Sequence, residues 1–132
     1  MKFSLAPYQS ILLSVLRIIS GLLMMQHGGQ KVLGFPAPSR APFELMSKIG
    51  VAGVLELVGG LLLAIGLFTR PTAFVMSGLM AFAYFLAHGL TEFWPMLNGG
   101  ELAVLYCFVY LYLAAAGGGY FSVDAMLARK KG

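Results

Sequence analysis

The sequence predicts an all-α protein, a transmembrane four-helix bundle with a short interfacial C-terminal helix. Of its 132 residues, 59% are hydrophobic and only 11% are charged, whereas a soluble domain carries about 25% charged residues. The mean hydropathy is +0.84. This composition excludes an ordinary soluble domain, and it excludes a disordered chain, which needs low hydrophobicity and high charge. A single transmembrane domain over residues 1–132 is the class that remains.

Four apolar segments with very few charges have the length of a membrane span. About 20 helical residues cross the hydrocarbon core of a bilayer, at about 1.5 Å per residue. An apolar first segment can also be a secretory signal, but Arg17 inside it and three further spans after it indicate a retained helix. The predicted spans cover residues 8–27, 47–68, 71–90 and 101–117.

The connections between these spans differ in length. Only Thr69 and Arg70 separate the second and third spans. Pro71 follows where a helix start tolerates a missing N–H, so these two helices are expected to form an antiparallel hairpin. The first connection, residues 28–46, holds three prolines and several large apolar side chains. This composition predicts a partly buried loop or a short surface helix.

Basic residues are concentrated at the C-terminus. Residues 122–131 begin with Ser122, a good helix N-cap, and end in Arg129, Lys130 and Lys131. They predict a short amphipathic helix at the membrane interface, so the net charge of +4 favours lipid headgroups over nucleic acid as the partner. Lysine and arginine number five on the side of the two termini and three on the other side. This asymmetry predicts that both termini are cytoplasmic.

Two charged residues fall near the middle of the predicted spans. Arg17 and Glu56 each lie nine residues after the start of a span, which places both about 13 Å deep on neighbouring antiparallel helices. An unpaired charge at that depth costs about 2.5–3.5 kcal/mol, so the sequence predicts an Arg17–Glu56 ion pair. The pair is either part of a proton or substrate path or a contact that orients the helices. Gly53, Gly59 and Gly60 share the face of Glu56, and this face is expected to meet the first helix.

A second polar group follows from the topology of four spans. The end of the first span, the end of the third and the start of the fourth lie at the same membrane side, whichever way the chain inserts. Two imidazoles and a carboxylate have the chemistry to bind quinone carbonyls, move protons or hold a metal, but no tight metal-ligand spacing is present, so no metal site is predicted. The candidate ligand-binding residues at these ends are His27, Lys31, His88, Asn98 and Glu101.

Structural roles are an alternative explanation for the same residues. Asn98-Gly-Gly-Glu101 has the spacing of a capping box, in which Asn98 caps the fourth span and Glu101 reaches back to it. His88 shares a stripe with Ser77 and Tyr84 on the third span, and it is equally explained as a hydrogen-bonded interior histidine. From the sequence alone, both interpretations stay open.

Several motifs, taken in order, resemble the DoxX family of small four-helix membrane proteins. They are Arg17 with Gly21, His27-Gly28 followed by Lys31, Glu56 within residues 53–60, the run Gly-Leu-Phe-Thr-Arg-Pro at 66–71, Asn98-Gly-Gly-Glu101, and residues 119–124. The resemblance covers almost the whole chain and implies a four-helix bundle in a bacterial cytoplasmic membrane.

The same resemblance implies a redox setting. The family takes its name from a resemblance to the membrane subunit of a thiosulfate:quinone oxidoreductase, and relatives are linked to oxidative and thiol stress. Relatives that work through paired cysteines are not matched, because Cys107 is the single cysteine of this chain. It has no partner for a disulfide within the chain, so dithiol exchange is not predicted.

These observations lead to three hypotheses about function. The first is a membrane component of a redox or stress-response system that holds a quinone-like ligand near His27, His88 and Glu101. If it is an enzyme, it is the membrane subunit of an oxidoreductase and receives electrons from a partner. The second is a structural or chaperone-like module that binds another membrane protein or a second copy of itself. The third is a small-solute or ion carrier, suggested by Arg17 and Glu56.

Overall fold

The structure is a computed structural model that describes residues 3–132, and these residues form helices with no strand. The predicted all-α class is therefore confirmed. Three of the long helices are long and apolar enough to cross a membrane, and the fourth, α5, is a shorter apolar helix of 16 residues, about 24 Å in length. The elements are a 3-10 turn (Ala6–Tyr8), α1 (Gln9–Leu33), α2 (Lys48–Ile65), α3 (Thr69–Ala87), α4 (Pro95–Asn98), α5 (Glu101–Ala116) and α6 (Val123–Lys131).

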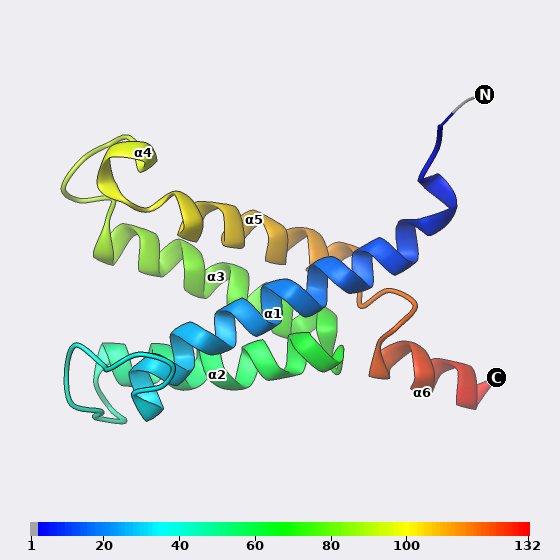
Figure 1. The fold of residues 1–132 in the computed structure, drawn as a ribbon, viewed down its shortest axis with the longest axis horizontal. Coiled ribbons are helices and arrows are strands. Elements are labelled where there is room, and N and C mark those ends of the chain that lie inside the picture. Colours follow the sequence, from blue (N-terminus) through cyan, green and yellow to red (C-terminus); the bar gives the residue numbers. More distant parts are fainter. Residues whose placement is uncertain (1–2) are drawn as a thin grey trace.

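The four long helices form two antiparallel pairs (Figure 1). α1 packs along α2 and α3 packs along α5, while α2 and α3 make a lesser contact between the pairs. In Figure 1 the pairs separate toward the end that carries α4 and the loop 34–47, which we call the loop end. The α2–α3 turn and α6 lie at the opposite end, the hairpin end. The predicted topology is confirmed, since the end of α1, the end of α3 and the start of α5 share the loop end.

Close approach of α1 and α2 depends on glycine. A Cβ atom on Gly28 would lie 2.3 Å from the backbone nitrogen of Leu57, and one on Gly21 would lie 2.7 Å from that of Ala64. These distances leave no room for a side chain, so the two backbones touch in the manner typical of small-residue contacts in membranes.

The glycine-lined face of α2 meets two different helices. Gly53 and Gly60 face α1, which confirms the expected contact with the first helix. Gly59 lies on the other side, where a Cβ atom would meet the sulfur of Met76 on α3. The face predicted to meet one helix is therefore divided between α1 and α3.

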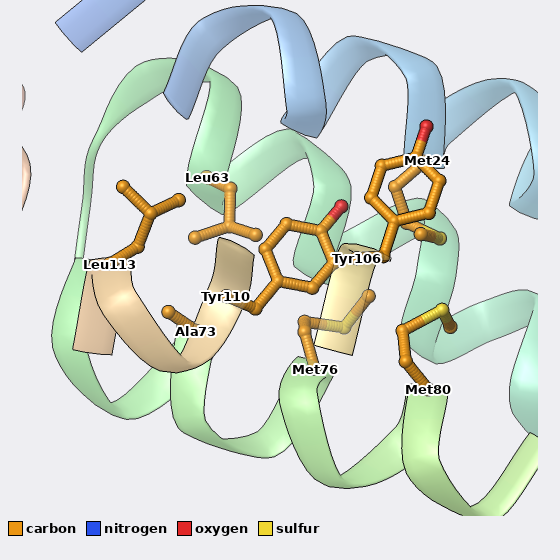
Figure 2. Packing of buried hydrophobic residues seen from close by; sticks show 8 residues of the cluster. All are labelled: Met24, Leu63, Ala73, Met76, Met80, Tyr106, Tyr110 and Leu113. Atoms are coloured by element: carbon orange, nitrogen blue, oxygen red, sulfur yellow. The ribbon is translucent and has the colours of Figure 1, made fainter. Parts of the chain in front are cut away.

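A core of eight buried side chains fills the space between the pairs (Figure 2). Tyr110 is completely buried, and its hydroxyl points toward α1, where it donates to the carbonyl of Ser20 at 2.9 Å. A buried tyrosine needs such a partner. The core residues are Met24, Leu63, Ala73, Met76, Met80, Tyr106, Tyr110 and Leu113.

Several helix ends differ from the predicted ones, and α3 stops at Ala87, three residues before the predicted end at 90. α1 continues to Leu33, six residues beyond the predicted end at 27, and stops at Gly34, which adopts a left-handed conformation (φ 66°). Thr69 and Arg70 belong to α3, and the turn before it consists of residues 66–68. The connection 34–47 contains no helix, and large apolar side chains such as Met46 (89% exposed) lie on its surface.

α6 confirms the predicted helix in the C-terminal tail. Ser122 is its N-cap, because the Ser122 hydroxyl accepts a hydrogen bond from the N–H of Ala125 at 3.1 Å. Arg129 lies over the ring of Tyr120, with its guanidinium carbon 4.8 Å from the ring centroid. The tail therefore folds back on the segment that joins it to α5.

Candidate functional site

A cavity of about 280 Å³ lies at the loop end, between the α1–α2 pair and the α3–α5 pair. Its volume is close to the lower limit of small-molecule pockets, about 300 Å³. Most of the wall is apolar, and it is interrupted by the imidazoles of His27 and His88, the ion pair of Lys31 and Glu56, and the hydroxyl of Tyr106. The lining residues are Met24, His27, Lys31, Glu56, Met80, Ala83, Ala87, His88, Gly99, Leu102, Ala103 and Tyr106.

An ion pair forms part of this wall. The ammonium nitrogen of Lys31 donates to both carboxylate oxygens of Glu56, at 2.7 and 2.5 Å. The side chain of Glu56 is only 5% exposed, whereas that of Lys31 is 30% exposed. Glu56 thus places a charge deep in the bundle, and Lys31 connects it to the cavity and to the surface.

The predicted Arg17–Glu56 ion pair is wrong. Gly28 of α1 faces Leu57 of α2, so Glu56 lies level with the part of α1 that follows Met24. Arg17 is eleven residues from Gly28, about 16 Å along the helix axis. The prediction assumed that the first helix ends at residue 27. Because α1 continues to Leu33, each residue of α1 lies at a different height relative to α2 than predicted.

Arg17 instead joins three segments at the hairpin end. Its side chain is fully buried, and its Nε donates to the carbonyl of Gly118 at 2.8 Å. Nη1 donates to the carbonyls of Leu63 and Ala64, at 2.5 and 2.8 Å, and Nη2 donates to that of Phe121. The last carbonyls of α2 lack helical partners, and a cation is favourable at a helix C-terminus. Arg17 therefore satisfies backbone groups and does not contact the cavity.

Asp124 caps the first turn of α3 from a distance in the sequence. Its carboxylate accepts from the N–H groups of Phe68 and Thr69, at 2.9 and 2.8 Å. Its own N–H donates to the carbonyl of Gly66 at 2.9 Å. A carboxylate at a helix N-terminus satisfies unpaired donors and interacts favourably with the helix dipole. The sequence has no local signal for this contact, because Asp124 lies 56 positions after Phe68 and 55 positions after Thr69.

His88 lies just after α3 and lines the cavity. Its Nδ1–H donates to the backbone carbonyl of Asn98 at 3.0 Å, which leaves Nε2 as an acceptor in the neutral imidazole. The side-chain amide of Asn98 donates to the hydroxyl of Tyr84 at 2.9 Å. Farther along the same face, the hydroxyl of Ser77 donates to the carbonyl of Cys107 on α5 at 2.7 Å. The stripe thus faces the bundle interior as expected, and Asn98 orients His88 without lining the cavity itself.

The predicted capping box is not formed. Asn98 is the last residue of α4, which ends at Gly99 with φ of 74°, and the N-cap position of α5 is Gly100. The side-chain oxygen of Asn98 accepts from the N–H of Gly100 at 2.8 Å, and no side chain caps α5. Glu101 is exposed and does not line the cavity. The sequence did not reveal the short α4, which removes Asn98 from the N-cap position.

The structure therefore brings together part of the predicted site and adds to it. His27, Lys31 and His88 line one cavity, with His27 at its exposed mouth. Glu56, which was expected to pair with Arg17, lies in the same wall, as does Tyr106. Within residues 3–132, no three His, Cys, Asp or Glu side chains gather into a group suited to a metal ion.

Known proteins are similar in sequence to this chain over most of its length. The family model for DoxX matches residues 12–89. A protein of Haemophilus influenzae named only as uncharacterized is 39% identical, with 96% of this chain and 98% of that protein covered. The inner membrane protein YqjF of Escherichia coli is 30% identical, with coverage of 88% and 92%. No solved structure matches the chain. The match over residues 12–89 and these relatives show that the chain belongs to the DoxX family.

Proposed function

We propose that this protein is an integral membrane component of a redox or stress-response system in a bacterial inner membrane, and that its loop-end cavity binds the head group of a quinone-like ligand. One observation carries the proposal. The cavity between the two helix pairs is mainly apolar, yet Lys31 and His88 reach it from different pairs. A quinone ring fits an apolar slot, and its two carbonyls need hydrogen-bond partners on separate sides.

The polar groups of the cavity suit both redox forms of such a ligand. Lys31 donates hydrogen bonds only, so it is matched to a carbonyl oxygen. The Nδ1–H of His88 donates to the carbonyl of Asn98, so Nε2 is free for the ligand. In the neutral ring Nε2 accepts a hydrogen bond from a hydroxyl, and in the protonated ring Nε2–H donates one to a carbonyl. Glu56 accepts both hydrogen bonds from Lys31 and provides a buried carboxylate next to the ligand. In this proposal the chain binds the ligand and holds protons near it, and electrons come from a partner protein.

The distribution of charge supports cytoplasmic termini. Three basic residues, Lys31, Arg40 and Lys48, lie at the loop end. The hairpin side has five, namely Lys2 (outside the described residues), Arg70, Arg129, Lys130 and Lys131. This bias of five against three favours the cytoplasm for the hairpin side.

The contact that suggested the carrier hypothesis is not formed. It depended on Arg17 and Glu56 sharing one level of the membrane, and Arg17 instead donates to four carbonyls at the hairpin end. The hypothesis of a structural module that binds another membrane protein or a second copy stays a prediction. It differs from the quinone proposal in requiring no occupant in the cavity.

Ligand occupancy is the test of this proposal. The protein is purified gently from membranes, its mass is measured under native conditions, and an organic extract is analysed for quinones. We expect one quinone per chain in the wild type and in Glu101→Gln, a matched polar change at the same end but outside the cavity. We expect the quinone to be lost in the double variant His27→Ala, His88→Ala. A wild type without quinone, or equal retention in the double variant, would overturn the proposal, and the native mass also reports the oligomeric state.

A further inference from the structure

An apolar groove continues the cavity along the contact between α1 and α5. Its volume is about 170 Å³, too small to hold a second drug-sized ligand by itself. It shares Leu102 and Tyr106 with the cavity. The lining residues are Leu16, Ile19, Ser20, Leu23, Leu102, Leu105, Tyr106 and Val109.

The floor of this groove is buried and its rims are open to lipid. Ser20 and Tyr106 are only 5% and 6% exposed, whereas Ile19 and Leu105 are 51% and 61% exposed. The hydroxyl of Ser20 donates to the carbonyl of Arg17 within α1 at 3.1 Å, so it needs no hydrogen-bond acceptor in the groove. A hydrocarbon chain is the occupant that such a lining favours.

The groove and the cavity follow one another along the same face of α1. Residues 16, 19 and 23 line the groove, and residues 24, 27 and 31 line the cavity, with the three- and four-residue steps of one helix face. From Leu16 to His27 the helix rises about 16 Å, close to the thickness of one hydrocarbon leaflet, about 15 Å. The polar cavity thus lies near the membrane surface, and the groove leads from it toward the middle of the bilayer. A lipid-like molecule in one leaflet has the same orientation, with its polar head at the surface and its tail toward the middle.

We propose that the ligand of the cavity is a membrane-borne amphiphile whose hydrocarbon tail lies in the groove, and that it enters from the bilayer between α1 and α5. This inference rests on the proposed function, because it assigns the tail of the same ligand. The continuity of the groove with the cavity at Leu102 and Tyr106 distinguishes it from the apolar depression between α2 and α3, which shares no residue with the cavity. The ligand head group contacts Lys31 and His88 while its tail replaces lipid against α1.

Two neighbouring leucines of α1 give a matched pair of variants. Leu23 lines the groove and is 41% exposed, and Leu22 is 45% exposed on the lipid side and lines neither the groove nor the cavity. A tryptophan at 23 fills the groove, whereas one at 22 adds the same ring to the outer surface. On α5, Leu105→Trp and Leu111→Trp repeat the comparison from the opposite wall.

The binding experiment uses two probes with one benzoquinone head group, one with a ten-carbon tail and one without a tail. Calorimetric titration into protein in lipid nanodiscs measures both. We expect the tail to improve the affinity of the wild type and Leu22→Trp at least tenfold. In Leu23→Trp we expect most of this gain to disappear while the affinity for the tailless probe is unchanged. Partition of the tailed probe into the bilayer is the same for all variants, so the ratio of its affinities for two variants measures the contribution of the groove.

The outcomes separate this inference from the proposed function. An undiminished tail effect in both Leu23→Trp and Leu105→Trp would overturn the groove assignment and leave head-group binding intact. A phospholipid retained in the groove while the tailed probe binds would also overturn it. If neither probe binds the wild type, the proposed function itself fails.

Discussion

Within residues 3–132, each end of the bundle contains one buried charged residue, and the two are satisfied in different ways. At the hairpin end, Arg17 is fully buried and donates to four backbone carbonyls from α2 and the segment before α6. At the loop end, Glu56 is 5% exposed and accepts from Lys31, whose side chain is 30% exposed. One charge is enclosed by backbone, and the other is held by a flexible side chain at the edge of a cavity.

This difference indicates a division of roles between the two ends. Two of the carbonyls that Arg17 contacts belong to α2 and two to the segment between α5 and α6, so its contacts hold three segments in one arrangement. Lys31 has four rotatable carbon bonds and access to the surface, so its ammonium group has more freedom to move than the backbone carbonyls around Arg17. The hairpin end therefore stabilises the fold, and in our proposal the loop end binds the ligand.

Removal of Arg17 is expected to cause the largest loss of stability. In Arg17→Met the carbonyls of Ala64 and Phe121 lose their donor, whereas those of Leu63 and Gly118 each keep one other. Each buried unsatisfied group costs about 1–3 kcal/mol. We expect the free energy of unfolding in detergent to fall by about 4 kcal/mol or more. Arg70→Met is the control, because Arg70 donates to the carbonyls of Ala114 and Ala115 at the same end but is exposed. A similar loss in both variants would show that burial is not the cause.

Changes to the ion pair at the loop end are expected to be unequal. Lys31→Met leaves a buried carboxylate without a partner and is expected to cost about 3 kcal/mol. Glu56→Gln leaves a lysine that reaches water, so we expect a loss of only about 1 kcal/mol. Unfolding of the two single variants and of the double variant measures this asymmetry, and the double variant should recover much of the loss of Lys31→Met. Equal losses in the two single variants would contradict the view that Lys31 is the mobile partner.

A smaller effect than those of Arg17→Met and Lys31→Met is expected at Asp124. Asp124→Ala removes the acceptor of two N–H groups at the start of α3 and is expected to cost about 1–2 kcal/mol. Because the same contact docks α6, hydrogen exchange in residues 123–131 should become faster. Quinone retention should not change, and a loss of ligand in this variant would mean that the two ends are coupled.

The sequence by itself determined the class of this protein and which helix ends lie together. Hydropathy and length predicted the all-α fold, and the order of the helices was enough to place His27, Lys31 and His88 at one end. The N-cap Ser122 was also readable, because a cap acts on an N–H only three residues away. These features depend on composition or on near neighbours, which a sequence displays directly.

Only the tertiary structure decided which charges meet. The level of Glu56 relative to α1 depends on where Gly28 contacts α2 and on how far α1 continues past residue 27, and no local pattern encodes either. For the same reason the contacts of Arg17 with residues 118 and 121 were not foreseen. The periodicity of a helix specifies the face on which a residue lies. The axial offset between α1 and α2 is set by the packing of their glycines, and this offset determines which charged side chains form an ion pair.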